Sequence, residues 1–138
     1  VHSEYNLSQD PLTIYQIWIE PNQRNVKPRW DSKKFPNRSK DDRLSLLVSG
    51  YPEDKEDALF IHQDARIYGG KVSKSAKFDH QITHQIYVLA SSGRFNIITD
   101  DAVITLNKGD GAEITKVDSI LFDVIEDSEI LVIDAPRR

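Results

Sequence analysis

Short runs of apolar and β-branched residues, separated by turn residues, recur along the chain from about residue 42 to the C-terminus. Such runs, bounded by clusters of Gly, Asn, Asp and Ser, are typical of β-strands. They predict strands at 44–48, 58–62, 65–68, 76–80, 85–90, 94–99, 102–106, 111–115, 120–124 and 129–133. Roughly ten short strands without an amphipathic helix pattern predict an all-β sandwich or barrel.

Turn chemistry predicts how these strands connect. Strands 58–62 and 65–68 form two arms around Gln63-Asp64, and the segment 95–106 alternates across Asp100-Asp101 as a hairpin does. The acidic run 53–57 predicts a solvated loop. Further breaks or bends are expected at Gly69-Gly70, Ser91-Ser92-Gly93 and Glu126-Asp127-Ser128.

The segment 12–19 predicts one more strand, because it is rich in β-branched and aromatic residues and lies between Pro11 and Pro21. Its apolar residues fall on both parities, as in a strand that is covered on both faces. Left unpaired, it would expose an edge and an apolar surface. We therefore expect it to pack on the barrel or on another chain, with Trp18 buried.

The segment 21–42 reads as a connector, because it is polar and basic and contains Pro21, Pro28 and Pro36. Trp30 and Phe35 are expected to anchor it by packing on a neighbouring surface. We predict the same packing role, and not that of a ligand platform, for both tryptophans of the chain.

Composition narrows the class of protein. The 138 residues suit one domain plus an appendage, and 38% hydrophobic with 29% charged residues is ordinary for a soluble protein without a membrane span. Because there is no cysteine, disulfides and thiolate sites are excluded, and we expect a cytoplasmic protein. The net charge of −4 argues against direct nucleic-acid binding. Because methionine is absent, we expect the sequence to begin inside a longer parent.

The first residues contain a candidate metal motif. His2 and Glu4 are two residues apart, so on an extended strand they project to the same face and offer one nitrogen and one oxygen donor. This pair is half of a metal site. Two donors at a chain terminus seldom hold a divalent ion tightly, because catalytic sites normally use three or four.

Two stretches resemble one known family. His2-Ser3-Glu4-Tyr5-Asn6 followed by 12–20 is similar to the middle of pirin-family bicupins, and Phe60-Ile61-His62-Gln63-Asp64-Ala65-Arg66-Ile67-Tyr68 is similar to the start of the second cupin in their bacterial, quercetinase-like members. The resemblance implies a cupin fold, the double-stranded β-helix or jelly-roll barrel. It also implies that 1–41 is a remnant of an N-terminal cupin plus a connector, and that 42–138 is the C-terminal cupin.

The same resemblance implies a chemistry. Family members use one mononuclear metal, such as Fe, Cu, Mn, Ni or Co, held by three histidines and a glutamate, to cleave flavonols such as quercetin with oxygen. His2 and Glu4 match two of these ligands, with the counterpart of Glu4 steering protonation of the substrate. The family's early His-x-His is absent from this sequence. We therefore expect the C-terminal half of a dioxygenase, inactive or weakly metal-binding by itself, with a metal-free second barrel.

Other functions stay open. The eukaryotic relatives are iron-dependent transcription cofactors, so the resemblance also allows a non-catalytic interaction or structural module. Two copies associating through the exposed N-terminal strand could join their His2 and Glu4 pairs at a symmetric interface. A third hypothesis is a jelly roll that binds a small molecule at the barrel mouth, where Tyr87, His80 and His84 would converge.

The remaining histidines have simpler interpretations. His80 and His84 are four residues apart, which could be misread as a helical metal pair, but their context predicts the polar rim between two strands. His62 precedes Gln63-Asp64, and we predict a structural role, with Asp64 accepting a hydrogen bond from the ring or capping a backbone amide.

Overall fold

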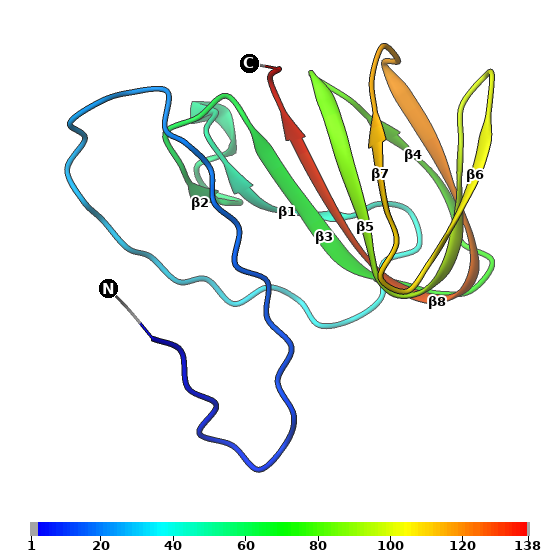
Figure 1. Ribbon diagram of the computed structural model, residues 1–138, viewed down its shortest axis with the longest axis horizontal. Helices are drawn as coiled ribbons and strands as arrows, with labels where there is room; N and C mark the ends of the chain where they lie inside the picture. Colours follow the sequence, from blue (N-terminus) through cyan, green and yellow to red (C-terminus); the bar gives the residue numbers. More distant parts are fainter. Residues whose placement is uncertain (1–2, 138) are drawn as a thin grey trace.

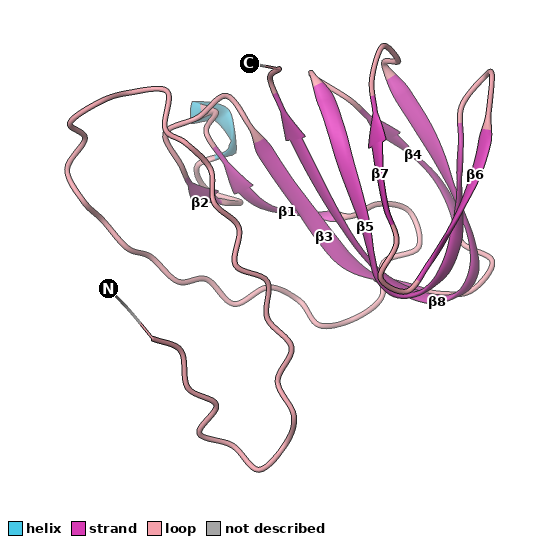
Figure 2. Cartoon of the chain, in the orientation of Figure 1, coloured by secondary structure: helices cyan, strands magenta, loops and turns pink. Residues whose placement is uncertain are grey.

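The computed structural model describes residues 3–137, and the strands within them form a single curled sheet (Figure 1). The described residues contain eight strands and one short 3-10 helix, η1 (Pro52–Asp54). Figure 2 shows how little of the chain is helical. The strands are β1 (Ser45–Ser49), β2 (Leu59–Phe60), β3 (Arg66–Val72), β4 (Lys77–Gln81), β5 (Gln85–Ile98), β6 (Val103–Asn107), β7 (Gly111–Ile114) and β8 (Ser119–Ala135).

Two long strands, β5 and β8, organise the sheet. The strand order is β2-β1-β3-β8-β5-β6, with β4 also paired to β8 and β7 also paired to β5. The start of β8 pairs with β4, and its end pairs with β3 in a register that sets Arg66 opposite Asp134. Because each long strand pairs with different strands along its length, the sheet curls around its own inner face (Figure 1).

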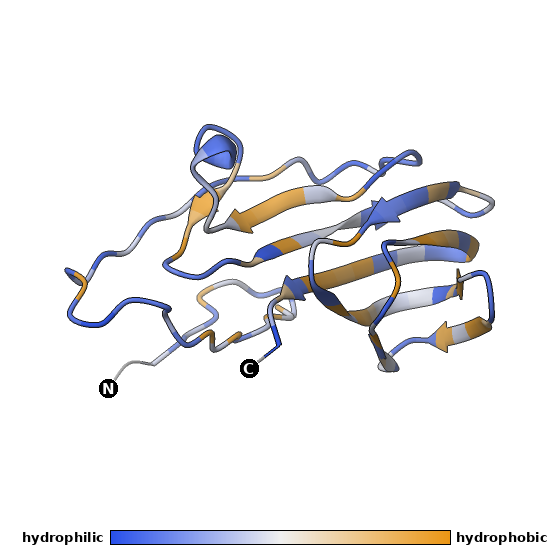
Figure 3. Cartoon of the chain, turned by 90° about the horizontal axis from the view of Figure 1, so that it is seen from above, coloured by the Kyte–Doolittle hydropathy of each residue, from blue (hydrophilic) through white to orange (hydrophobic). Residues whose placement is uncertain are grey.

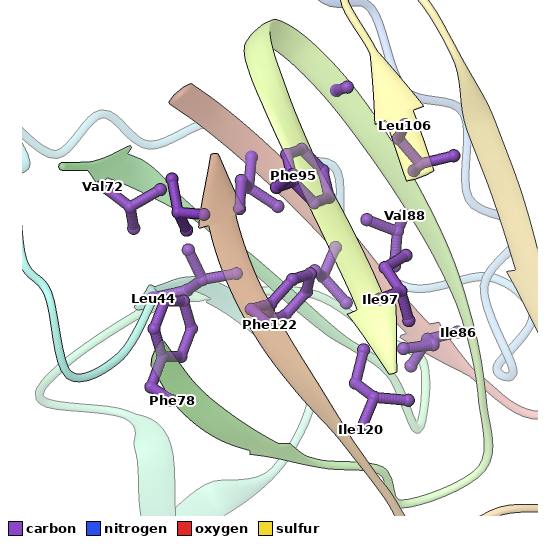
Figure 4. Close-up of a cluster of buried hydrophobic side chains, with 14 of the residues drawn as sticks. Leu44, Val72, Phe78, Ile86, Val88, Phe95, Ile97, Leu106, Ile120 and Phe122 are labelled. Carbon is purple, nitrogen blue, oxygen red and sulfur yellow. The ribbon is translucent and has the colours of Figure 1, made fainter. Parts of the chain in front are cut away.

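The inner face is a tightly packed apolar core (Figure 4). Alternate residues of β5 and β8 point inward, as strand geometry requires, and the intervening ones face out. Phe122 lies at the centre, with ring centroids 5.2 Å from Phe78 and 5.7 Å from Phe95. Hydrophobic and hydrophilic colours accordingly alternate along the strands in Figure 3. The predicted all-β fold is confirmed.

Two predicted strand breaks are wrong, because β5 and β8 run through them. Within β5 the pairing register to β8 shifts between Ala90 and Phe95, and Gly93 adopts a φ of 77°. A β-bulge therefore absorbs the turn residues. In β8, the buried Ser128 hydroxyl donates to the Glu126 carbonyl (2.6 Å) and accepts the Arg94 amide (3.0 Å). These bonds replace the ladder bonds that the bulge interrupts.

Two local predictions near β3 are also wrong. Residues 58–62 and 65–68 do not pair with each other, because β2 pairs with β1 in parallel and β3 pairs with β1 and β8. Gly69-Gly70 lies inside β3 and makes no bend. A Cβ at Gly69 would approach Leu47 Cδ1 to 2.9 Å, so close packing explains the glycine. The hairpin across Asp100-Asp101 is confirmed by the pairing of β5 with β6.

Residues 3–44, which we call the N-terminal arm, precede the first strand and cross the molecule as an extended chain (Figure 1). The predicted strand at 12–19 does not form, because a strand needs a hydrogen-bonding neighbour and the arm's anchors here are sparse. The Tyr15 hydroxyl donates to Ser91 Oγ at 2.7 Å. Trp18 is 83% exposed, so its predicted burial is wrong for the single chain.

The connector part of the arm is held by polar contacts more than by packing. The Asn22 amide donates to the His62 carbonyl (2.7 Å), and Lys33 Nζ donates to the Glu56 carbonyl (2.8 Å). Phe35 is partly buried, but Trp30 is 88% exposed, which contradicts the packing role predicted for it. No helix among the described residues is long and apolar enough to span a membrane.

Candidate functional site

Only one residue of the predicted metal pair, Glu4, lies within the described part of the chain. His2 lies outside the described residues, and Glu4 is exposed on the arm. Among residues 3–137 there is no group of three or more His, Asp or Glu side chains placed to hold a metal ion. These residues alone therefore do not fit a metal centre, and no reaction step is derived through one.

His80 and His84 are separated by the structure, and the prediction of a shared polar rim is wrong for His80. His80 continues the inward row of β4 behind Ala76 and Phe78 and is only 8% exposed. His84 is exposed, and its Nε2 lies 2.9 Å from the Tyr51 hydroxyl. Four-residue spacing places both side chains on one face only in an unbroken strand, and β4 ends at Gln81.

His80 is buried in the core among aromatic rings. Its ring meets Tyr68 edge-on at 4.7 Å and Phe122 at 6.0 Å, and no described residue hydrogen-bonds to its Nε2. Burial lowers the pKa of His80, and the Asp134 carboxylate only partly offsets that shift. The imidazole is therefore neutral near pH 7.

Asp134 continues the inward row of β8 and is 1% exposed. One carboxylate oxygen accepts the Thr83 amide (2.7 Å), and the other accepts the His84 amide (3.0 Å). Asp134 thus caps the turn between β4 and β5, because its two oxygens satisfy backbone donors that neither strand pairs.

Arg66 connects this turn to η1 and the loop before it. Its Nε donates to Asp54 (2.7 Å), its Nη2 donates to Glu53 (3.1 Å), and its guanidinium carbon lies 4.0 Å from the centre of the Tyr51 ring. The predicted solvated acidic loop is thus wrong for Asp54, whose side chain is 18% exposed. We call Tyr51, Asp54, Arg66, His84 and Asp134 the Arg66 cluster.

Asp54 and Tyr51 of the Arg66 cluster have shifted pKa values. Burial pushes the pKa of Asp54 upward, but hydrogen bonds from Ser49 and Arg66 outweigh burial, so the pKa lies below its usual value. Burial raises the pKa of Tyr51, against the opposing charge of Arg66. The Tyr51 hydroxyl therefore stays protonated, and it can donate a hydrogen bond to His84 Nε2.

Replacing Arg66 with glutamine is expected to lower the free energy of unfolding by about 1 kcal/mol, because Asp54 loses a charge-assisted partner. Since the folded-state pKa of Asp54 is depressed, its stabilising contribution is present above its unfolded pKa and is lost as the pH falls through the folded value. Urea titrations between acidic and neutral pH check this. The variant should show a smaller loss of stability on acidification, whereas an identical pH dependence would contradict the pairing.

The other candidates do not form a binding mouth. Tyr87 faces outward on β5, and its hydroxyl lies over Gly111, where a Cβ would collide with it. The inward His80 therefore does not meet Tyr87, and the predicted convergence of these residues is wrong. His62 packs edge-on against Phe60 at 4.9 Å, and Asp64 accepts a hydrogen bond from Asn22 Nδ2 (3.3 Å). The partner of Asp64 is thus the Asn22 side chain, in place of the His62 ring or the backbone amide predicted for it.

A curled, all-strand sheet around an apolar core, with long strands shared between its two halves, is the architecture expected of a cupin. The family of quercetinase C-terminal cupin domains matches residues 46–135 of this chain. The chain belongs to that family, as the sequence resemblance predicts.

Proteins similar to this chain carry related names. It is 39% identical over 96% of its length to "Putative quercetin 2,3-dioxygenase ZMO1337" of Zymomonas mobilis, covering 55% of that protein. It is 33% identical over 97% of its length to a pirin-like protein of Caulobacter vibrioides, covering 56% of it. The solved structure of YhhW from Escherichia coli shares the fold, with a TM-score of 0.74 and 24% identity over 88% of this chain and 49% of that one. The chain thus spans about half the length of the relatives it matches.

Sequence reasoning missed the Arg66 cluster, and one signal could have revealed it. Asp134 shares the parity of Ile130 and Val132, and His80 shares that of Phe78, so strand alternation places both polar residues inside. Arg66 gave no such signal, since its partners lie on a separate loop.

Proposed function

We propose that this chain is the C-terminal half of a metal-dependent bicupin of the quercetin 2,3-dioxygenase type, and that it holds no complete metal centre by itself. Residues 42–138 would be the C-terminal cupin, and 1–41 would be the end of a first cupin plus a connector. The substrate of the whole protein would be a flavonol-like small molecule. The observation that carries this proposal is coverage: nearly the whole chain aligns, but only to about half of each relative.

The donors for the metal would be divided between two parts of the whole protein. His2 and Glu4 would supply one nitrogen and one oxygen ligand, and the rest would come from the portion of the relatives that this chain does not cover. A bacterial pirin of the same fold, YhhW from Escherichia coli, has been solved with nickel(II). In the whole protein, a transition metal of this kind would supply Lewis-acid chemistry, with Glu4 as one of the residues that hold it.

Metal binding by the purified chain tests the proposal. Calorimetric titration with nickel(II) or iron(II) should show weak binding that is lost in His2→Ala and in Glu4→Gln, because only two protein donors are available. Asp10→Asn, an exposed carboxylate change on the same arm, is the matched control and should leave the titration unchanged. Tight one-to-one binding that survives both ligand changes would contradict the divided site.

The packed barrel interior favours a second candidate, a non-catalytic cupin that serves as an interaction or structural module. Phe95, Phe122 and Val88 are fully buried at the place where a ligand-binding barrel would keep a cavity. In that case the C-terminal cupin would support a partner domain without reacting. Measurable turnover of quercetin by this chain alone would eliminate this candidate.

A further inference from the structure

Two adjoining hollows lie between the N-terminal arm and the edge of the barrel. The first has a volume of about 420 Å³ and is lined by Arg29, Asp31, Pro52, Lys55, Ala58 and Phe60. The second, of about 580 Å³, is lined by Val26, Lys27, Pro28, Arg29, Trp30 and His62. Arg29 lines both, and the Phe60 and His62 rings touch beneath it, so the two hollows form one surface. Each volume falls within the range of small-molecule sites.

Aromatic surface is open in these hollows. Phe60 is 37% exposed, and Trp30 is 88% exposed, which is unusual for a side chain of that size. No ring contact or hydrogen bond between Trp30 and another described residue accounts for its position. A flat ring placed against Trp30 or Phe60 would cover apolar area that water now wets.

Positive charge gathers around the same surface. In a chain with a net charge of −4, the segment 21–40 contains one acidic residue, Asp31, and seven basic ones: Arg24, Lys27, Arg29, Lys33, Lys34, Arg38 and Lys40. Two of these seven, Lys27 and Arg29, line the hollows, and Lys55 lines the first hollow from the barrel side. The surface is therefore complementary to an anion.

Arg29 is placed to bind an anion and a ring together. Its guanidinium carbon lies 5.6 Å from the centre of the Phe60 ring, and Nη1 donates to the Phe60 carbonyl (3.3 Å). Its carboxylate partner, Asp31, lies at 3.1 Å, but the two side chains are 42% and 56% exposed. An exposed pair of this kind is weak, so a ligand carboxylate can replace Asp31 at little cost.

We propose that these hollows bind a small planar aromatic carboxylate, with its ring against Trp30 or Phe60 and its carboxylate on Arg29, assisted by Lys27 or Lys55. This site is independent of the proposed dioxygenase function, because it uses none of the metal-ligand residues.

Calorimetry with 1-naphthoate, compared with the neutral 1-naphthalenemethanol, tests the site on the intact chain. We expect naphthoate to bind with a Kd of about 1 mM or tighter, and roughly tenfold more tightly than the alcohol. Arg29→Gln should weaken naphthoate binding roughly tenfold. Arg24→Gln removes a charge from the same segment but lines neither hollow, so it should leave binding unchanged.

Amide NMR locates the ligand in the same experiment. The Trp18→Phe variant assigns the indole N–H signal of Trp30, which should shift on titration while that of Trp18 stays in place. Circular dichroism checks that Arg29→Gln is folded, which is expected because the side chain is 42% exposed. Equal binding of naphthoate and the alcohol, or an equal loss of binding in both arginine variants, would overturn the proposal. So would an indole shift confined to Trp18. Adenosine monophosphate carries a ring and a phosphate, and tighter binding of it than of naphthoate would likewise contradict a carboxylate site.

Discussion

Replacing Phe122 with alanine is expected to lower the free energy of unfolding by about 3–5 kcal/mol, the usual cost of removing a buried aromatic side chain. Phe122 is fully buried and contacts Phe78, Phe95 and His80 from the middle of β8. Because β8 pairs with three other strands, a cavity there weakens both ends of the sheet at once. Urea unfolding, followed by circular dichroism, measures the change.

Phe60→Ala is the matched control for this prediction. It deletes the same atoms at a position that is 37% exposed, on a strand of two residues at the edge of the sheet. The expected loss is therefore much smaller. Because a small domain has only about 5–15 kcal/mol of stability, Phe122→Leu serves as a milder second variant. Equal losses at positions 122 and 60 would contradict the packing described.

Replacing His80 with phenylalanine is expected to raise the free energy of unfolding by about 1–3 kcal/mol at neutral pH, the cost of burying a polar atom without a hydrogen bond. The neighbouring Tyr68 and Phe122 rings already form an aromatic environment of suitable shape. The hydrogen-bonded Asp134 carboxylate stays satisfied by the Thr83 and His84 amides in the variant.

The same substitution should flatten the pH dependence of stability. The folded-state pKa of His80 is depressed by burial, so below the ordinary histidine value of about 6.5 the unfolded state binds more protons than the folded state. The native protein therefore loses stability as the pH falls from about 6.5 toward the folded pKa. His80→Phe should remove that part of the slope. Parallel slopes in the wild type and His80→Phe would contradict the buried, neutral imidazole.

The strand pattern could be predicted from sequence because it depends on local alternation. Each predicted strand from 44 to 133 has most of its residues in an observed strand, except 58–62, of which only Leu59–Phe60 form β2. The treatment of turn residues as breaks was wrong. Gly93 packs closely against Ser128 where the β5–β8 register shifts, and both strands continue through this bulge. That pairing depends on contacts between residues 34 apart, which composition does not show.

The candidate site was less predictable for a related reason. The resemblance of His2 and Glu4 indicated the family but not a complete donor set, since other ligands are expected beyond this sequence. The strand prediction at 12–19 was wrong in the single chain because propensity alone supplies no pairing partner. The burial predicted for Trp18 and Trp30 failed in the same way, because hydrophobicity indicates that a side chain can be buried without showing what would cover it.

The central claim is that this chain carries a folded C-terminal cupin and only part of a dioxygenase centre. Quercetin turnover under air, measured with the purified chain and added iron(II), copper(II), manganese(II) or nickel(II), tests it most directly. Cooperative unfolding in urea first shows that the purified chain is folded. The folded chain should then show no quercetin turnover above the blank with metal alone. The claim would be contradicted if the chain turned over quercetin faster than the blank and Glu4→Gln abolished this turnover. That result would show a working metal centre within these residues.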